Sequence, residues 1–260
     1  MIIEGITTKT IKMAYLSFPG LQLDYTMIGK IRSFLSEKFT KYNLTYNEHD
    51  PVTNRYVYGY PLIQYKILNK QFTIIAATEK AIKALQEIFF PMNELNINGE
   101  ILYLDEKKIK TKNELLGISK RSITYQFCSP WIPYDNQQND NKFNKEEHNF
   151  NNHFVNNQVK RNFEEYLSLN PQNSQNDEKK KLRNSLVSNI IGICHNKKGL
   201  DYQISERLSA SIDLRPITVK FKAEETTAYV GNFDINFNIP NLLSIGRDPS
   251  RGFGTIMRLI

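Results

Sequence analysis

Cysteine is scarce in this 260-residue sequence, which contains only Cys128 and Cys194. The two lie far apart and form no Cys-x-x-Cys pair, so neither a zinc site nor a dithiol redox centre is indicated. Both stand within apolar stretches. We therefore expect both to be thiols of the hydrophobic core.

Long hydrophobic runs are also missing. No apolar run approaches the ~20 residues of a membrane span, and the first twelve residues lack the long apolar region of a signal peptide. Hydrophobic residues make up 40% of the chain and charged residues 23%, which is typical of a globular protein. The length suits one large domain or two of ordinary size. We expect a cytoplasmic protein without a membrane partner.

Acidic residues are fewer than basic ones. The chain contains 34 Lys and Arg and 27 Asp and Glu, which gives a net charge of +7. Residues 135–181 hold seven basic and eight acidic side chains, so the positive excess lies in the rest of the chain. Such a balance makes nucleic-acid binding a reasonable hypothesis. Surface charge that serves only solubility is the alternative.

The most informative segment is the glycine-rich loop, residues 244–254, which runs into the apolar residues 255–260. Its glycines could present bare backbone amides to a phosphate chain, and its basic residues could pair with that chain. The expected contact residues are Gly246, Arg247, Ser250, Arg251, Gly252 and Gly254. No helix follows, which excludes a dinucleotide-binding loop or a P-loop. An ordinary turn before an edge strand is the alternative.

The first half of the chain has the pattern β-α-β-β-α-β. Strand-like residues 11–18 end at Pro19-Gly20, and Asp24 can cap a helix. Residues 56–68 and 71–76 are β-like, Thr78 can cap a second helix, and residues 94–110 suit a closing strand or hairpin. This order predicts a ferredoxin-like domain in residues 1–120.

Residues 121–260 repeat the pattern less clearly. Residues 122–128 suit a strand and residues 181–195 a helix, whereas a second helix is hardly visible. Strands are predicted at 208–214, 216–221, 228–230 and 233–237, the last two joined around Gly231. The Asn-rich residues 135–177 are a polar insertion that cannot bury enough apolar surface to fold by itself. The predicted fold class is α+β, with tandem ferredoxin-like (RRM-like) βαββαβ domains.

Four segments together resemble a known family. They are the C-terminal residues 236–257 with LLSIG and SRGFGTI, YPLIQYK at 60–66, SPW at 129–131, and LVSNIIGICHNKKGL at 186–200. In this order they resemble the CRISPR-associated endoribonucleases that process precursor CRISPR RNA, members of the RAMP superfamily. The resemblance implies tandem ferredoxin-like domains and RNA cleavage without a metal or other cofactor.

Cleavage of RNA without a metal needs a base that deprotonates the 2′-hydroxyl and an acid for the departing 5′-oxygen, and histidine titrates in the right range. Of the four histidines, His148 and His153 lie in the polar insertion, and His195 ends an apolar helix. His49 follows the first helix, where the resembled family commonly carries its general base. Lys41, Tyr42 and Tyr46 are candidate acids or phosphate stabilisers. A solvated turn histidine paired with Asp50 is the alternative.

Two further charge features bear on RNA binding. Lys180, Lys181 and Arg183 crowd the expected start of the second-half helix, where the helix dipole disfavours cations, and phosphate contact would explain them. A solvated charge run is the alternative. Asp248 introduces a negative charge into the glycine-rich loop. It either orients Arg247 or Arg251 or weakens RNA binding.

We therefore expect a metal-independent endoribonuclease that binds CRISPR repeat RNA and leaves a 2′,3′-cyclic phosphate and a 5′-hydroxyl. It would act as a monomer or homodimer, and subunits of a CRISPR effector complex are possible further partners. One alternative is a non-catalytic RNA-binding subunit of such a complex. Another is a protein-interaction or regulatory module that never touches nucleic acid.

Overall fold

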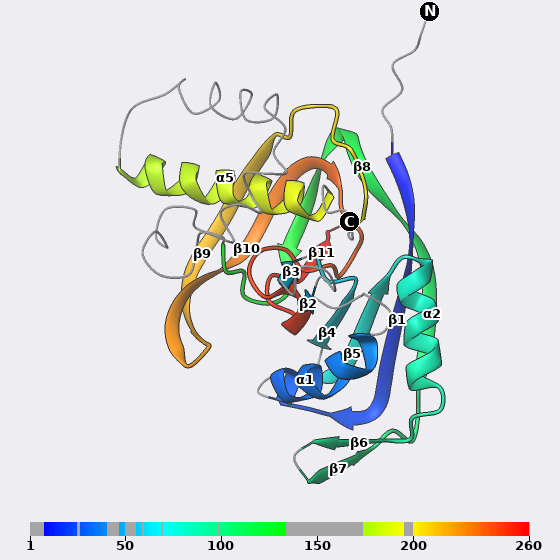
Figure 1. The fold of residues 1–260 in the computed structure, drawn as a ribbon. Coiled ribbons are helices and arrows are strands. Elements are labelled where there is room, and N and C mark those ends of the chain that lie inside the picture. Colours follow the sequence, from blue (N-terminus) through cyan, green and yellow to red (C-terminus); the bar gives the residue numbers. More distant parts are fainter. Residues whose placement is uncertain are drawn as a thin grey trace, which may run out of the picture.

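The structure is a computed structural model. It describes residues 8–24, 27–40, 47–49, 56–58, 60–68, 70–97, 99–133, 174–194 and 200–259. In chain order (Figure 1), its elements are β1 (Thr8–Gln22), α1 (Met27–Thr40), β2 (Asn47–His49), β3 (Tyr56–Tyr58), β4 (Ile63–Leu68), β5 (Gln71–Ala77), α2 (Glu79–Phe89), β6 (Glu94–Ile97), β7 (Glu100–Tyr103), β8 (Lys108–Phe127), α5 (Ser174–Cys194), β9 (Ala210–Phe221), β10 (Glu224–Asn238), the 3-10 helix η1 (Pro249–Arg251) and β11 (Ile256–Arg258).

The first unit comprises β1, α1, β4, β5, α2 and the N-terminal part of β8. Its strands follow the order β4-β5-β1-β8, and every neighbouring pair is antiparallel. The ring of Phe18 stacks on that of Phe72, with centroids 5.4 Å apart, and lies 5.8 Å from the ring of Phe89 in α2. This helix-covered face confirms the ferredoxin-like arrangement predicted for the first half.

The second unit repeats the order with the rest of β8, α5, β9, β10 and β11. β10 lies between β9 and β8, and β11 pairs with the far end of β8. At the place of a second helix the described chain has only a turn and η1. The tandem ferredoxin-like fold is confirmed, with a reduced second copy.

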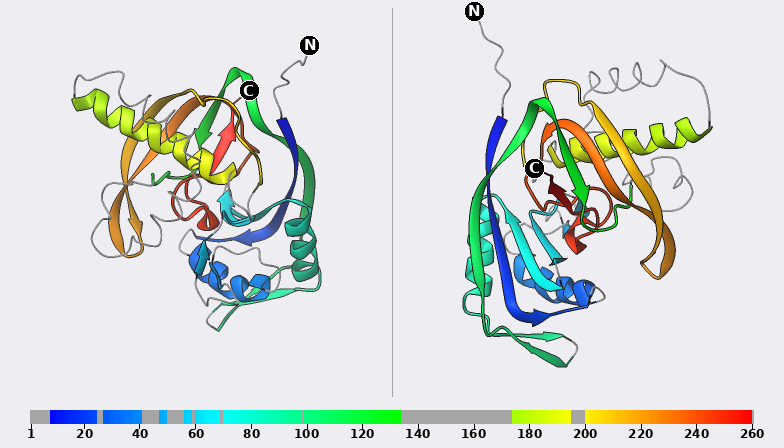
Figure 2. Two further views of the ribbon diagram at one scale, coloured as in Figure 1. Left: turned by 45° about the horizontal axis from the view of Figure 1, so that its top comes forward. Right: turned by 180° about the vertical axis from the view of Figure 1, so that it is seen from behind.

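Strand β8 belongs to both units. Its residues 108–117 pair with β1, whereas residues 117–126 pair with β10 and residues 125–127 with β11. The views in Figure 2 show it following β1 and then turning toward β10. The predicted boundary between residues 120 and 121 falls inside this strand, and the division of the chain into two domains stays a prediction.

Several local predictions differ from the structure. β1 continues past Pro19, with an irregular register between Ser17 and Gln22. Residues 94–103 form the predicted hairpin, β6 and β7, but as a separate two-stranded sheet, so the strand that closes the first unit is β8. Thr78 precedes α2, but its side chain makes no capping hydrogen bond.

The turn predicted around Gly231 is also wrong. Gly231 lies within the continuous strand β10, and its φ of 132° allows the backbone of Asp213 on β9 to approach closely. The hairpin instead turns at Lys222 and Ala223, both at positive φ. β9 contains Pro216, which is tolerated because β9 lies at the edge of the sheet.

The two cysteines differ in burial. Cys194 is buried, as predicted, and burial raises the pKa of its thiol to about 12. Cys128 is exposed, so its assignment to the core is wrong. It follows the buried Phe127 at the end of β8, and side chains of an extended chain alternate between the two faces.

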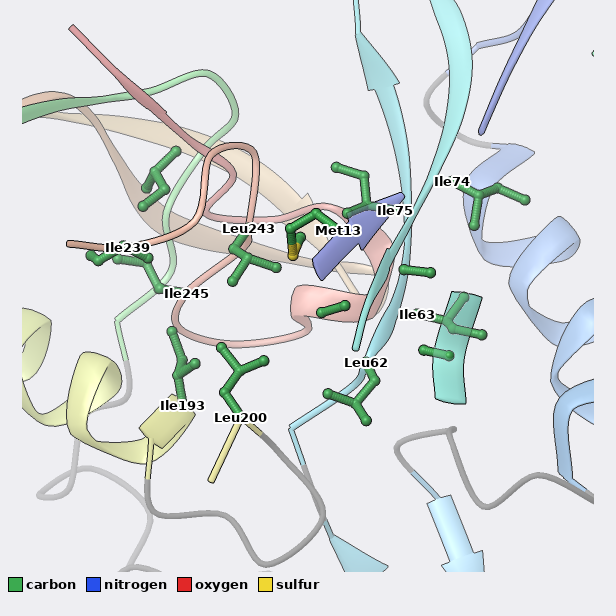
Figure 3. Packing of buried hydrophobic residues seen from close by; sticks show 14 of the residues in the cluster. Met13, Leu62, Ile63, Ile74, Ile75, Ile193, Leu200, Ile239, Leu243 and Ile245 are labelled. Carbon is green, nitrogen blue, oxygen red and sulfur yellow. The ribbon is translucent and has the colours of Figure 1, made fainter. Parts of the chain in front are cut away.

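One apolar cluster extends through both units (Figure 3). It includes Met13, Leu62 and Ile75 of the first unit. It also includes Leu243, which precedes the glycine-rich loop, and Ile245 within the loop. Because these side chains are buried together, the loop is fixed against the first sheet. In the described part of the chain, every helix is too short or too polar to cross a lipid bilayer.

Candidate functional site

The glycine-rich loop closes on itself where the two units meet (Figure 1). Its first residue, Ser244, forms a β-bridge with Thr255, and the amide of Ile245 donates to the carbonyl of Gly254 at 2.9 Å. η1 occupies the middle of the loop. The predicted terminal strand is confirmed as β11, which directly follows.

The glycines of the loop permit close packing. Gly246, Gly252 and Gly254 all have positive φ, and a Cβ at each would come within 2.8 Å of a neighbouring backbone oxygen. The amide of Gly252 donates to Pro249 O at 3.1 Å and that of Gly254 to Pro130 O at 2.8 Å. Both glycines are buried. The prediction that these two amides lie bare for a phosphate chain is therefore wrong.

The segment YPLIQYK holds the start of the loop. Tyr60 donates its hydroxyl hydrogen to Ser244 O at 2.8 Å, and the amide of Ser244 donates to Gln64 Oε1 at 3.0 Å. Gln64 Nε2 in turn donates to the hydroxyl oxygen of Tyr60 at 2.8 Å. Both the amide and the carbonyl of Ser244 are thus bound by side chains of the first unit.

Lys66 of the same segment is buried beneath the loop. Its Nζ donates to the hydroxyl oxygen of Ser244 and, at 3.0 Å, to that of Thr255. Loss of hydration holds the pKa of Lys66 well below its usual range. Lys66 is not among the predicted site residues. The available signal is a lysine in the apolar run of β4, two residues after Gln64 and therefore on the same face.

The SPW segment holds the other end of the loop. Ser129 Oγ donates to Gly252 O at 2.5 Å and accepts from the amide of Thr255 at 2.8 Å. The buried Trp131 donates from Nε1 to Asn189 Oδ1 of α5 at 3.1 Å. Asn189 belongs to the fourth family-like segment, so all four segments meet around the loop.

The cations of the loop have defined neighbours. The guanidinium of Arg247 lies 5.1 Å from the ring centroid of Phe221. Arg251 Nε lies 3.3 Å from Asp248 Oδ2, and the buried Ser250 donates its hydroxyl hydrogen to Asp248 Oδ1 at 3.3 Å. Of the two roles considered for Asp248, the ion pair with Arg251 is present in the structure. Arg247 and Arg251 remain partly exposed.

The basic residues of α5 lie farther along their helix than predicted. The helix begins at Ser174, so Lys180, Lys181 and Arg183 stand beyond its first turn. Lys181 is exposed, and the other two are partly exposed. The premise that they crowd a helix N-terminus is wrong, and their contact with RNA stays a prediction.

The predicted catalytic residues are placed only in part. His49 lies in β2, where its backbone pairs with Tyr56 of β3. β3 leads along the chain into the segment that begins at Tyr60 and binds the loop. The side chain of His49 and the residues Lys41, Tyr42 and Tyr46 lie outside the described residues, as do His148, His153 and His195. Within the described ranges, no three His, Cys, Asp or Glu side chains gather as a metal site requires.

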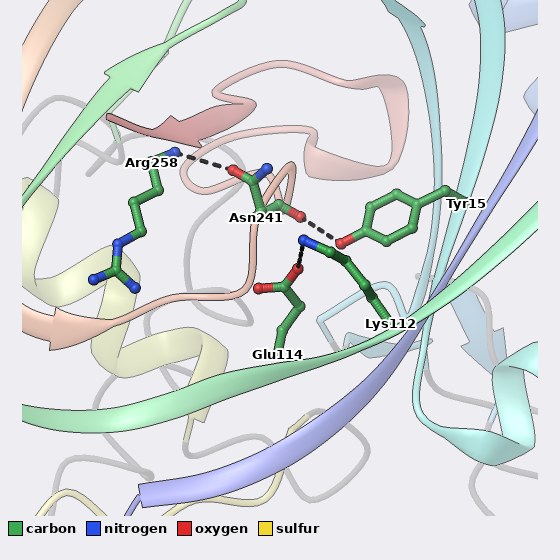
Figure 4. Close-up of polar contacts among 5 residues, drawn as sticks. All are labelled: Tyr15, Lys112, Glu114, Asn241 and Arg258. Atoms are coloured by element: carbon green, nitrogen blue, oxygen red, sulfur yellow. Dashed lines mark hydrogen bonds and ion pairs between the residues drawn. The ribbon is translucent and has the colours of Figure 1, made fainter. Parts of the chain in front are cut away.

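A second polar contact joins the units (Figure 4). Tyr15 donates its hydroxyl hydrogen to Asn241 O at 3.2 Å, and the amide of Arg258 donates to Asn241 Oδ1 at 3.0 Å. Beside them, Lys112 Nζ lies 3.4 Å from Glu114 Oε1. Burial and the nearby Glu114 raise the pKa of Tyr15. Polar groups and charged groups of both signs therefore lie at this part of the junction.

Comparison with known proteins gives consistent matches. A model of the Cas6b N-terminal domain matches residues 9–115, and a model of the Cas6b C-terminal domain matches residues 147–259. An uncharacterised protein of Methanocaldococcus jannaschii is 32% identical over 174 residues, which cover 66% of this chain and 97% of that protein. Among solved structures, a Cas6b crystal structure is 27% identical with a TM-score of 0.72, over 96% of this chain and all of that chain. A second one, described as the CRISPR RNA processing endoribonuclease Cas6b, is 24% identical with a TM-score of 0.63 over the same shares.

Proposed function

The chain belongs to the Cas6b family, and we propose that it is an endoribonuclease that binds CRISPR repeat RNA and cleaves the precursor transcript within each repeat. The observation that supports this most strongly is the convergence of the four family-like segments on the glycine-rich loop. Three of the four segments supply side chains that bind the loop or a residue packed against the loop. These side chains are Tyr60, Gln64, Ser129 and Asn189. An ordinary turn before an edge strand, which is the alternative interpretation of this loop, would not need hydrogen bonds from three other segments of the chain.

The proposed reaction is an internal transesterification. A base removes the proton of the 2′-hydroxyl, whose oxygen attacks the adjacent phosphate, and an acid protonates the departing 5′-oxygen. The products are a 2′,3′-cyclic phosphate and a 5′-hydroxyl, and the reaction needs no metal. His49 is the proposed base, and Lys41, Tyr42 or Tyr46 supplies the acid or stabilises the charge on the phosphate.

The proposed RNA contacts divide into cations and supporting residues. Arg247 and Arg251 on the loop and Lys180, Lys181 and Arg183 on α5 would pair with phosphates. Gly246, Gly252, Gly254 and Ser250 would contribute by shaping the loop, because the glycines allow its close packing and Ser250 bonds to Asp248. The base would lie near this surface because β3, the partner strand of His49, leads into the segment that binds the loop.

The test is cleavage of labelled repeat RNA by the purified full chain in excess EDTA. We expect one cut per repeat, with a cyclic phosphate on the upstream product. A matched RNA with a 2′-deoxyribose at the cut site should bind equally well and stay intact, because it lacks the attacking oxygen. Cleavage that EDTA abolishes would contradict the metal-independent chemistry.

Binding without a product would instead indicate a non-catalytic RNA-binding subunit. A gel shift at rising salt provides this measurement, and absence of any shift at low salt would favour a protein-interaction module. Gly252→Asp should lose both binding and cleavage, because a side chain at this position meets Tyr65 O at 2.8 Å. The loop would then have to move off β4.

A further inference from the structure

Lys66 is buried where the two units join. Only 1% of the residue is exposed, so its amine cannot reach a bound RNA. The residue pairs with Thr73 of β5, and its Nζ crosses to the second unit, where it donates to the hydroxyl oxygens of Ser244 and Thr255. These two residues form the bridge that closes the glycine-rich loop. Lys66 therefore binds both ends of the loop at once.

The hydrogen bonds around Lys66 suit an uncharged amine. A neutral amine has two N–H donors, and the described residues offer its nitrogen two acceptors, Ser244 Oγ and Thr255 Oγ1. The two hydroxyl oxygens lie 3.0 Å apart, and the hydroxyl of Thr255 donates to Gly252 O at 2.8 Å. Each hydroxyl hydrogen thus also has an acceptor. A buried ammonium would carry a third donor and an unpaired charge, both of which are unfavourable in a protein interior.

We propose that Lys66 is a positioning residue, which fixes both ends of the glycine-rich loop to β4 and so aligns the RNA-holding loop with the hairpin that carries His49. This inference rests on the proposed function. β4 continues the chain from β3, the partner strand of β2. A shift of the loop relative to β4 would therefore move the scissile phosphate relative to the base.

The other contacts do not replace this one. Tyr60 and Gln64 hold only the backbone of Ser244, and Ser129 holds the far end of the loop from the second unit itself. Without Lys66, no described side chain of the first unit donates to Thr255. The loop would stay folded on its own unit while its register against β4 loosened. A misplacement of about 1 Å can slow a reaction by roughly 100-fold.

The experiment compares Lys66→Met with the full-length wild type. Methionine keeps the length and apolar stem of lysine but removes its donors. Lys83→Met is the matched control, because Lys83 is an exposed lysine of α2. Two quantities are measured: the single-turnover cleavage rate at saturating repeat RNA, and hydrogen exchange of the amides of Gly252, Gly254 and Thr255.

We expect Lys66→Met to cleave about 30- to 100-fold more slowly at saturating RNA and to exchange these three amides faster than wild type. Its melting temperature should equal or exceed that of wild type, because a buried amine has been removed. This combination separates positioning from a merely structural role, which would lower melting temperature and activity together. Lys83→Met should behave as wild type in every measurement.

Wild-type cleavage and exchange in Lys66→Met would overturn the proposal, as would a lowered melting temperature with uniform loss of protection across the sheet. Should Lys66→Met fail to fold, Thr255→Val decides, since it keeps the lysine and removes one of its two acceptors, together with the hydrogen bond from Thr255 to Gly252 O. It should then show the same slow cleavage, and normal cleavage would overturn the proposal. If wild type does not cleave repeat RNA, the proposed function fails, and the exchange of the three amides alone decides whether Lys66 positions the loop.

Discussion

Trp131 donates a hydrogen bond from its indole nitrogen to the side-chain oxygen of Asn189, at 3.1 Å, and so joins the chain that follows β8 to helix α5. The same indole lies against the loop, because a Cβ on Gly246 would come within 2.6 Å of its Nε1. Two family-like segments, joined through residues that are 58 positions apart, therefore support one loop. Their side chains keep the loop in place, whereas the proposed RNA contacts of the loop are its partly exposed arginines.

Replacement of Gly254 by alanine should destabilise the protein by about 2–3 kcal/mol. Gly254 has a φ of 63°, and the added Cβ would lie 2.0 Å from Ile245 O. Gly192→Ala is the control, because Gly192 lies in α5 with no heavy atom within 4 Å of the Cβ position. It should gain up to about 1 kcal/mol from helix propensity. Urea denaturation measures both, and equal stability of the two variants would contradict the expected clash.

His49→Ala should slow single-turnover cleavage by about 100- to 10,000-fold, the usual contribution of a general base. Binding of repeat RNA should stay within about twofold of wild type, because the proposed cationic contacts are elsewhere. His153→Ala, in the Asn-rich insertion, serves as the control and should cleave normally. Full activity of His49→Ala would move the base to another residue.

Asp248→Asn should tighten RNA binding. The change removes the carboxylate that lies 3.3 Å from Arg251 and leaves that guanidinium free for phosphate. The plot of log affinity against log salt concentration should steepen by about 0.7 for one added phosphate contact on a single strand. Asp105→Asn changes the net charge equally at an exposed residue of the first unit. If both variants alter the slope alike, the effect is one of overall charge.

The stability of wild type relative to Lys66→Met should rise with pH. The pKa of Lys66 is lowered in the folded protein, whereas in the unfolded chain it is about 10.4. Between these two values the unfolded state binds the extra proton, so the free energy of unfolding increases with pH by at most about 1.4 kcal/mol per unit. This stability is lost as the pH falls through the folded pKa.

Urea titrations of wild type, Lys66→Met and Lys83→Met between pH 7 and pH 10 measure this difference. Lys83→Met should run parallel to wild type, because its lysine is exposed in both states. A Lys66→Met curve that is also parallel to wild type would mean that the buried amine keeps an ordinary pKa.

Periodicity predicted the first unit well. The apolar residues Ile28, Ile31 and Leu35 recur at helical spacing. This spacing predicts a helix with one buried apolar face, and all three side chains are buried in α1. Prediction was poorer where the role of a residue depends on contacts with residues that are distant in the sequence. Gly231 resembles a turn residue, yet it admits the backbone of Asp213, which lies 18 positions earlier in the sequence.

The candidate site shows the same limit. The position of the loop could be predicted, because glycines and arginines concentrated in one short segment can be recognised in the sequence. Whether the amides of Gly252 and Gly254 are free depends on Pro249 and Pro130, and the second of these is distant in sequence. Lys66 could not be predicted for a related reason, because its two partners are hydroxyl groups that lie 178 and 189 residues away in the sequence.

The shared strand β8 has a consequence for handling the protein. Severing the chain between residues 120 and 121 would cut a single strand and separate the apolar cluster that extends through both units, so each fragment would expose apolar surface, which invites aggregation. We expect fragments of this kind to be insoluble when expressed separately, and the intact chain to melt in one calorimetric transition. A hinge between the halves would have to bend or break β8, so we expect the two halves to move together.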